Sequence, residues 1–322
     1  MENILLNKDL GFLRLGAAVP PLRIADVDFN VKAIIDIIKE AKGRGVQVLA
    51  FPEMAVTGYT IADLVQQQVL LEKARRGLFE IAKETGDGSM AVIVGMPLVV
   101  EQKIFNCAAV IASGRVAGIV PKIFLPNYRE FYEERWFSPG AEARSRSVEI
   151  EGQLIPFGLD LLFKLRGIEA AVIGVEICED LWVPLAPHEY QALAGATVLV
   201  NLSASNEILG KTDWRRTMTG SESGRCIATY CYTSSGIGES SNDIVYSGHA
   251  LIAENGVILK ESERLSSNPQ LVVSDIDLDR LVHDRLAMNS YRDSSAQTRE
   301  FRLIEVTVAD ITPGRSPRWL RS

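Results

Sequence analysis

The sequence predicts an α/β fold in one domain, with two mixed β-sheets covered by helices. Three observations lead to this class. Short runs rich in Val and Ile recur with helical stretches between them, three of these runs follow one another directly, and elements of both kinds continue to about residue 290 without a linker. Because consecutive strands favour antiparallel pairing over one purely parallel sheet, we expect the sheets to be mixed.

The first elements alternate between strand and helix. An apolar run predicts a strand over residues 13–18, another predicts a strand over 46–51, and residues 64–85 are largely helical in pattern. The helix between the two strands begins after Asp26 or Asp28, either of which is a suitable N-cap. Its apolar residues recur at the three- and four-residue spacing of a helix face: Val31, Ile34, Ile35, Ile38 and Ala41.

Three consecutive strands are predicted over residues 91–100, 106–112 and 115–121, with Ser113-Gly114 as a tight turn between the last two. Asn255-Gly256 separates two further runs as a hairpin turn does. The later elements are strands 170–176, 197–202, 230–234, 249–253, 257–260 and 272–275, and helices 189–194, 213–229 and 279–287.

Composition excludes several classes of protein. The 322-residue chain is 47% hydrophobic and 23% charged, with a net charge of −7 and basic residues spread among acidic ones, so a nucleic-acid partner is not expected. No apolar run reaches the roughly 18 residues of a membrane span, and residues 1–12 do not form a signal peptide. The four cysteines lack zinc-type or secreted spacing, which indicates reduced thiols in a cytoplasmic protein and no metal site. We expect a domain over 1–290 and a linker-like tail over 291–322.

Two predicted strands end in proline followed by one charged residue. Glu53 follows Pro52 at the end of the second strand, and Lys122 follows Pro121 at the end of the fifth. α/β folds build their sites at the ends of strands. A lysine in apolar surroundings can stabilise an oxyanion or hold a carboxylate ionised. The alternatives are a solvated loop acid and a surface lysine with its stem on apolar neighbours.

Cys178 stands where a β-run gives way to a helix-like turn. Such a position favours a thiolate, although a free cysteine is more often a small buried hydrophobe. The neighbouring acids disfavour a thiolate, so a base or a cation has to compensate. The three histidines, His188, His249 and His283, have no distinctive setting. A glutamate acting as general base, with a lysine to stabilise the oxyanion, solves the same problem without histidine.

The segments FPEMAVTGY, PKIFLPNYREFYEERWFSPG and VEICEDLW, in this order, resemble the nitrilase superfamily of carbon–nitrogen hydrolases. More narrowly, GYTIADL, CEDLWVP and GATVLVNLSAS resemble the N-terminal glutaminase domain of glutamine-dependent NAD+ synthetases. The resemblance implies a four-layer αββα sandwich and hydrolysis of the glutamine side-chain amide through a thioester. It places the family's catalytic triad on Glu53, Lys122 and Cys178, and a second glutamate on Glu133.

The resemblance also implies a set of substrate-binding residues. Their positions in this sequence are Tyr128, Glu179, Trp182, Ser205 and Lys211. Tyr59 is a further candidate, and a packed loop aromatic is its alternative. A lysine at position 211 can pair with the substrate α-carboxylate, but not in the bidentate manner of an arginine.

No cofactor is expected for the glutaminase reaction. ATP and Mg2+ belong to a synthetase domain with a glycine-rich phosphate loop, and this sequence has no such loop. The expected partners are glutamine and an ammonia-accepting synthetase domain or subunit, and a homo-oligomer is expected by analogy. Two alternatives stay open: an amidase or carbamoylase acting on another small amide, and an inactive interaction module.

Overall fold

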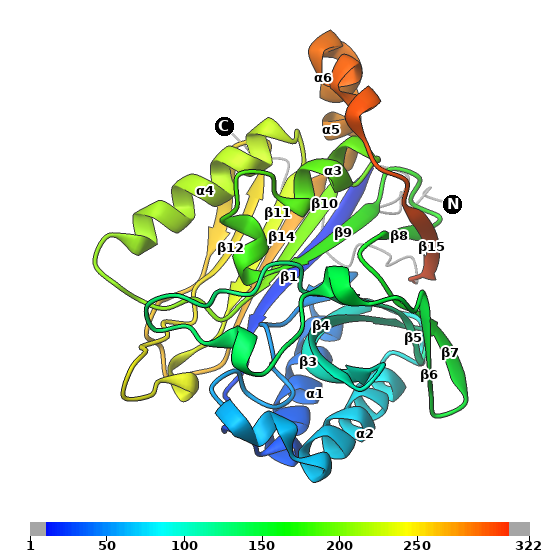
Figure 1. Ribbon diagram of the computed structural model, residues 1–322. Helices are drawn as coiled ribbons and strands as arrows, with labels where there is room; N and C mark the ends of the chain where they lie inside the picture. Colours follow the sequence, from blue (N-terminus) through cyan, green and yellow to red (C-terminus); the bar gives the residue numbers. More distant parts are fainter. Residues whose placement is uncertain (1–10, 309–322) are drawn as a thin grey trace.

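Two large β-sheets packed face to face form the centre of the molecule (Figure 1), which a computed structural model describes over residues 11–308. Within that range the first sheet has six strands, in the order β14 (Gln270–Asp277), β1 (Phe12–Val19), β2 (Val48–Ala50), β3 (Ala91–Val100), β4 (Lys103–Ala112) and β5 (Arg115–Pro121). The second has seven, in the order β13 (Val257–Glu261), β12 (Ala250–Glu254), β11 (Thr229–Ser234), β10 (Val198–Ser203), β9 (Val172–Ile177), β8 (Leu161–Arg166) and β15 (Arg302–Thr307).

Both sheets are mixed, as the sequence predicts. β1, β2 and β3 are parallel, whereas β3, β4 and β5 form the predicted antiparallel meander. In the second sheet β9, β10 and β11 are parallel and β12 and β13 are an antiparallel hairpin. Asn255 and Gly256 join that hairpin with φ angles of 44° and 89°, the left-handed pair that a tight two-residue turn requires.

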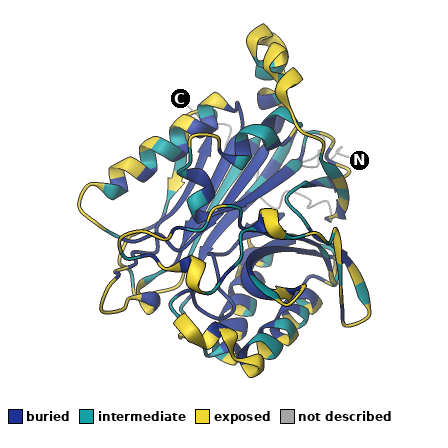
Figure 2. Ribbon diagram, viewed as in Figure 1, coloured by how far each residue is buried: buried dark blue, intermediate teal, exposed yellow. Residues whose placement is uncertain are grey.

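Helices cover the outer face of each sheet, which makes the four layers αββα. α1 (Val27–Gly43) and α2 (Gln68–Glu84) pack on the first sheet, and α3 (Pro187–Leu193) and α4 (Lys211–Arg225) pack on the second (Figure 1). A third apolar layer lies between the sheets and includes Leu15 of β1 and Val200 of β10. Figure 2 shows the strands buried and the outer sides of the helices exposed. The expected nitrilase-type sandwich is therefore confirmed.

Local sequence signals explain several element boundaries. The Asp26 side chain accepts a hydrogen bond from the Phe29 N–H at 3.2 Å and so caps α1, whereas Asp28 lies in its first turn. The predicted helix over 64–85 is divided, because Gln67 is extended between the 3-10 turn η2 (Ala62–Gln66) and α2. The predicted strand over 46–51 is shorter, since only Val48–Ala50 pairs with both neighbours.

Four strands have no counterpart in the sequence prediction. β6 (Ser147–Ile150) and β7 (Gln153–Pro156) form a short hairpin with little buried surface. β8 is buried almost throughout. Neither the hairpin nor β8 therefore shows the alternation of apolar and polar residues that predicts a strand. β15 pairs in parallel with β8, so the second sheet continues past residue 290, the domain end expected from the sequence. Residues 1–10 and residues 309–322, the last part of the predicted tail, lie outside the described residues.

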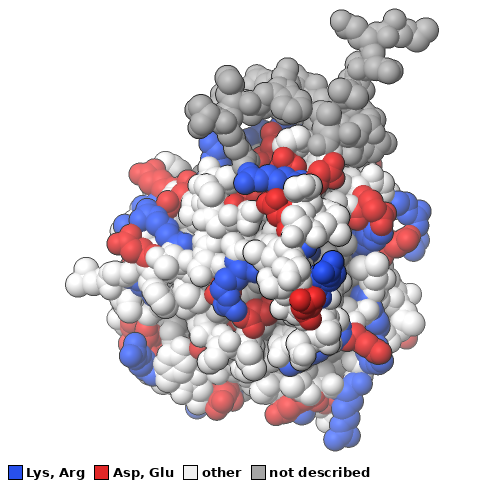
Figure 3. Space-filling view, turned by 90° about the horizontal axis from the view of Figure 1, so that it is seen from above, with Lys and Arg blue, Asp and Glu red and all other residues white. Residues whose placement is uncertain are grey.

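Two helices follow the last strand of the first sheet. α5 (Leu278–Ala287) packs through its first turns, and α6 (Asn289–Ser294) projects away from the sheets (Figure 1). Among residues 11–308 no helix has the length and apolar character to cross a membrane. Basic and acidic side chains are interspersed over the face in Figure 3.

Candidate active site

The three candidate catalytic residues each follow the end of a strand. Glu53 lies three residues beyond β2 and Lys122 one residue beyond β5, both in the first sheet. Cys178 follows β9 of the second sheet and begins the 3-10 turn η5 (Cys178–Leu181). All three are at least 95% buried, so the site lies inside the sandwich.

Glu53 is held by three hydrogen bonds. Its Oε1 accepts from Lys122 Nζ at 2.7 Å and from Asn106 Nδ2 at 2.6 Å, and its Oε2 accepts from the Ala204 N–H at 2.7 Å. Gly95 of β3 makes the close approach of this turn possible, because a Cβ there would lie 2.3 Å from the Met54 nitrogen. The carboxylate therefore has a fixed orientation.

Lys122 bridges two carboxylates. Its Nζ donates to Glu53 Oε1 and to Glu133 Oε1, both at 2.7 Å, and its side chain has no exposed surface. Burial lowers the pKa of Lys122, but Glu133 and Glu53 raise it more, and the net direction is well upward. The lysine is consequently an ammonium.

Glu133 lies in the 3-10 turn η3 (Glu133–Arg135) and is completely buried. Its Oε1 also accepts from the Tyr59 hydroxyl at 2.7 Å, whereas its Oε2 has no hydrogen-bond partner among the described residues. Burial raises the pKa of Glu133 to about 7, with Lys122 opposing and Glu53 adding to the shift. A buried acceptor without a partner calls for a donor from outside the chain.

Cys178 adopts a left-handed backbone conformation, with a φ of 46°. Such a conformation is uncommon for a non-glycine residue and persists only where the surrounding structure enforces it. Burial raises the pKa of the Cys178 thiol, and Glu53 raises it further against the lowering effect of Lys122. The resting thiol is therefore neutral and needs a base to become a nucleophile.

Asp180 ties the cysteine turn to the lysine segment. Its carboxylate accepts from the Ile177 N–H at 3.0 Å, just before Cys178, and from the Phe124 N–H at 2.9 Å, just after Lys122. Burial raises the pKa of Asp180 to about 8.

The predicted substrate-binding residues gather around the cysteine turn. The Tyr128 hydroxyl donates to Glu179 Oε1 at 2.9 Å, and Lys211 Nζ lies 5.4 Å from the centre of the Trp182 ring. The remaining residue of the set, Ser205, is buried, and its hydroxyl has no partner among the described residues.

Three of these substrate-binding candidates interact electrostatically with the Cys178 thiol. Tyr128, Glu179 and Lys211 each interact with Cys178, and Glu179 interacts with Lys211. Burial lowers the pKa of Lys211 and raises that of Glu179. A cation, an acid and a tyrosine thus act on the same thiol, and the Trp182 ring lies beside the cation. Tyr59 lies deeper, against Glu133, rather than in this outer group.

Several residues that build the site escape prediction from the sequence. Asn106 orients Glu53, Asp180 fixes the cysteine turn, and the buried Glu239 accepts from the Tyr59 and Thr60 N–H groups. His188, which has no distinctive setting in the sequence, lies between two glutamates at the back of the cysteine strand. A polar residue within an otherwise apolar strand, such as Asn106 in β4, is the sequence signal that could have identified these supporting residues.

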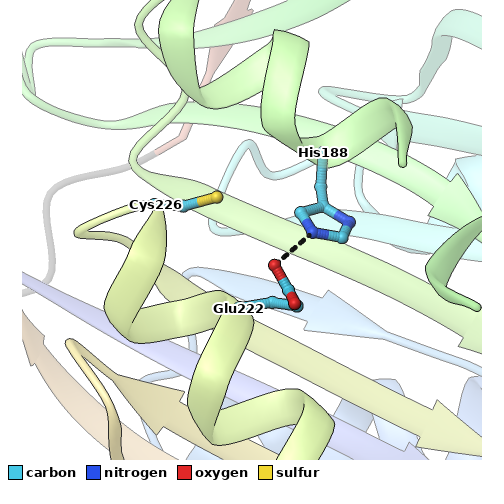
Figure 4. A group of neighbouring side chains, drawn as sticks. All are labelled: His188, Glu222 and Cys226. Carbon is cyan, nitrogen blue, oxygen red and sulfur yellow. Dashed lines mark hydrogen bonds and ion pairs between the residues drawn. The ribbon is translucent and has the colours of Figure 1, made fainter. Parts of the chain in front are cut away.

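The part of the chain that the structure describes holds one group with metal-ligand chemistry, made of His188, Glu222 and Cys226 (Figure 4). Their possible ligand atoms lie within 4.8 Å of one another. Arg225 already pairs with Glu222, at 2.9 and 3.0 Å.

The carbon-nitrogen hydrolase family model matches residues 15–285. The chain is 39% identical over 290 residues to the glutamine-dependent NAD(+) synthetase of Mycobacterium tuberculosis (strain ATCC 25618 / H37Rv), covering 90% of this chain and 43% of that protein. A crystal structure of a glutamine-dependent NAD(+) synthetase from Cytophaga hutchinsonii matches with a TM-score of 0.74 and 33% identity, over 82% of this chain and 43% of that one.

A mutant of the Nesterenkonia AN1 amidase from the nitrilase superfamily has the same fold. It matches with a TM-score of 0.65 and 19% identity over 87% of this chain and 96% of that chain. The chain thus spans less than half the length of the synthetases it matches, and nearly the whole of the amidase.

Proposed function

The chain belongs to the carbon-nitrogen hydrolase family, and we propose that it hydrolyses the side-chain amide of glutamine to glutamate and ammonia through a thioester on Cys178. One observation carries the proposal. A fully buried lysine is bound at 2.7 Å to each of two buried carboxylates, and all three charges act on the pKa of a buried thiol that lies on a left-handed turn. This arrangement supplies a nucleophile, a base and an oxyanion donor.

In the proposed reaction Glu53 takes the proton from Cys178 Sγ, and the sulfur attacks the amide carbon. Lys122 donates a hydrogen bond to the oxyanion of the tetrahedral intermediate. The C–N bond then breaks, and the protonated Glu53 returns its proton to the departing nitrogen, which leaves as ammonia. Glu53 next activates a water molecule that hydrolyses the thioester and frees glutamate and the thiol.

Glu133 holds the reacting amide in this proposal. Its Oε1 is occupied by Lys122 and Tyr59, but the buried Oε2 is open to a donor. The substrate amide offers an N–H donor, and a carboxylate accepting it would present the carbonyl carbon to the thiol. Glu133 would thus orient both the lysine and the substrate.

The amino-acid end of glutamine fits the charges around the cysteine turn. The α-carboxylate would pair with Lys211, and the α-ammonium with Glu179, which Tyr128 holds in place. Trp182 would stack on the aliphatic part of the substrate, and the free hydroxyl of Ser205 would donate to the carboxylate. An amide without these two charges would lose both ion pairs and leave Glu179 with Tyr128 and Lys211 with Asn206 as their hydrogen-bond partners.

We further propose that the ammonia is used by an ATP-dependent synthetase domain or subunit. The support is the similarity to glutamine-dependent NAD(+) synthetases, of whose length this chain covers 43%. ATP and Mg2+ would act in that synthetase part rather than on the residues described here.

Ammonia release from glutamine, compared with a panel of aliphatic amides, tests the reaction. We expect glutamine to be preferred, and Cys178→Ser to abolish release while Cys231→Ala, a buried core cysteine, keeps it. A glutamine analogue with an electrophilic group should add its mass to Cys178 alone. Preference for a small uncharged amide would favour a stand-alone amidase, and no turnover or adduct would favour an interaction module.

A further inference from the structure

A buried row of charges lies behind the cysteine turn. His188 of α3 is hydrogen-bonded through Nδ1 to Glu176 of β9 at 3.1 Å. Its Nε2 is hydrogen-bonded to Glu222 of α4 at 3.2 Å (Figure 4). The histidine has no exposed surface. Tyr230 of β11 also donates to Glu176, and its ring meets the imidazole edge-on with centroids 5.4 Å apart.

The protonation state of His188 follows from its partners. A neutral imidazole donates from one nitrogen only, whereas both nitrogens here face carboxylates, which only accept. Burial lowers the pKa of His188, but Glu176 and Glu222 outweigh it and raise the pKa to about 10. Arg225 pairs with Glu222 at 2.9 Å and also with Glu189 at 2.7 Å, so two cations, His188 and Arg225, face three acidic side chains.

A metal ion fits this group less well than a proton. Burial raises the pKa of the nearby Cys226 thiol to about 12, so the thiol is a weak ligand. The Nε2 atom that would bind the metal already donates to Glu222, and the Arg225 cation lies against the same carboxylate.

The row of charges reaches the active site through Asn201 of β10. The Asn201 amide donates to Glu176 Oε1 at 3.1 Å and to the Cys178 carbonyl at 3.4 Å. Its oxygen accepts from the Ser203 hydroxyl at 2.7 Å, which fixes the orientation of the amide. The carbonyl of the left-handed Cys178 is thus hydrogen-bonded to a side chain that Glu176 also binds, and Glu176 in turn is bound by His188.

We propose that His188, as an imidazolium, is a positioning residue for the Cys178 nucleophile, acting through Glu176 and Asn201. Loss of the proton removes one of the two cations from the row, leaves Glu176 less firmly held, and frees the Asn201 amide from its place on the cysteine carbonyl. This inference rests on the proposed function for its effect on turnover, but not for its effect on the thiol itself.

The test compares His188→Gln with His283→Gln, a control at an exposed histidine. At pH 8 we expect kcat of His188→Gln to be about 10- to 100-fold below wild type, because small misplacements of a nucleophile have effects of this size. KM should change little, since no substrate-binding residue touches His188. Above pH 10 the wild type should fall towards the variant, because its own His188 is then neutral, whereas a purely structural role predicts a constant ratio.

Glu222→Gln is a second variant, useful if His188→Gln does not fold. It removes one of the two charges that keep His188 protonated, so the alkaline fall in kcat should move to lower pH. The rate at which iodoacetamide alkylates Cys178 should show the same pH-dependent convergence of wild type and variant. This measurement needs no substrate, so it separates a failure of the inference from a failure of glutamine hydrolysis.

Nitrogen-15 NMR of the imidazoles reports the protonation state of His188 independently. The chain has three histidines, and the loss of signals in His188→Gln and His283→Gln assigns them. The His188 nitrogens should keep imidazolium shifts at pH 8. The proposal is overturned if His188 is neutral at pH 8, if His188→Gln keeps wild-type kcat and pH profile, or if elemental analysis finds a stoichiometric metal that His188→Gln loses.

Discussion

Replacing Lys122 with methionine tests the charge arrangement at the centre of the site. Methionine has a similar length and fills the same apolar space, but it cannot donate to Glu53 or Glu133. Both carboxylates lie 2.7 Å from the lysine nitrogen, and all three side chains are at most 1% exposed. The variant therefore leaves two neighbouring buried carboxylates without a cation.

The expected loss of stability follows from that burial. Removing one partner from a buried ion pair costs about 3–5 kcal/mol, because the remaining charge stays in a low-dielectric surrounding. Lys103 is a matched control, since it pairs with Glu142 while 38% and 51% of the two side chains are exposed. Lys103→Met should therefore cost less than about 1 kcal/mol.

Urea unfolding at pH 8 and pH 5.5 measures both effects. In Lys122→Met the pKa of each orphaned carboxyl rises, so the native state takes up protons that the unfolded state does not as the pH falls. The deficit should consequently be smaller at pH 5.5 than at pH 8. Adding Glu133→Gln removes one of the two charges and should restore part of the stability. A deficit near that of Lys103→Met, or one that grows on acidification, would refute this reasoning.

Three further outcomes are expected. Gly95→Ala should lose about 1–3 kcal/mol of stability by overpacking and most of its kcat, because its Cβ meets the Met54 backbone, whereas Gly43→Ala, with open space around it, should lose neither. Asp180→Asn turns an amide donor toward backbone N–H groups, so its kcat should fall and its unfolding free energy drop by about 1–3 kcal/mol. The pKa of His188 is raised to about 10 in the folded protein, so its protonation stabilises the folded state by an amount on the order of 5 kcal/mol. This stabilisation should be complete below about pH 6.5 and lost as the pH rises through 10. Unfolding of wild type and His188→Gln across that pH range would measure it.

The sequence predicts the fold and the three central residues for a common reason. Apolar strands ending at Glu53, Lys122 and Cys178 interrupt their pattern with a charged or reactive side chain, and strand ends of neighbouring sheets can meet. Local signals also predict the meander and the Asn255-Gly256 hairpin, because their pairing is decided by residues close together in the chain.

The supporting residues are less predictable because their partners are distant. His188 is 12 residues from Glu176 and 34 from Glu222, and nothing in the sequence shows that the three side chains converge. β15 is missed for a related reason. It joins the sheet by pairing with β8, more than 130 residues earlier, and only one of its residues, Val306, is buried.

The bridged lysine explains how the attack of the thiol on the amide can take place in a buried site. At rest Lys122 neutralises part of the charge of Glu53 and Glu133 while the thiol is neutral. When Glu53 takes the thiol proton it becomes neutral, and the negative charge appears on the oxyanion instead. The number of anions around Lys122 is therefore the same before and after attack. Because the negative charge only changes its position next to a fixed cation, the buried site needs no water to reorganise around the transition state.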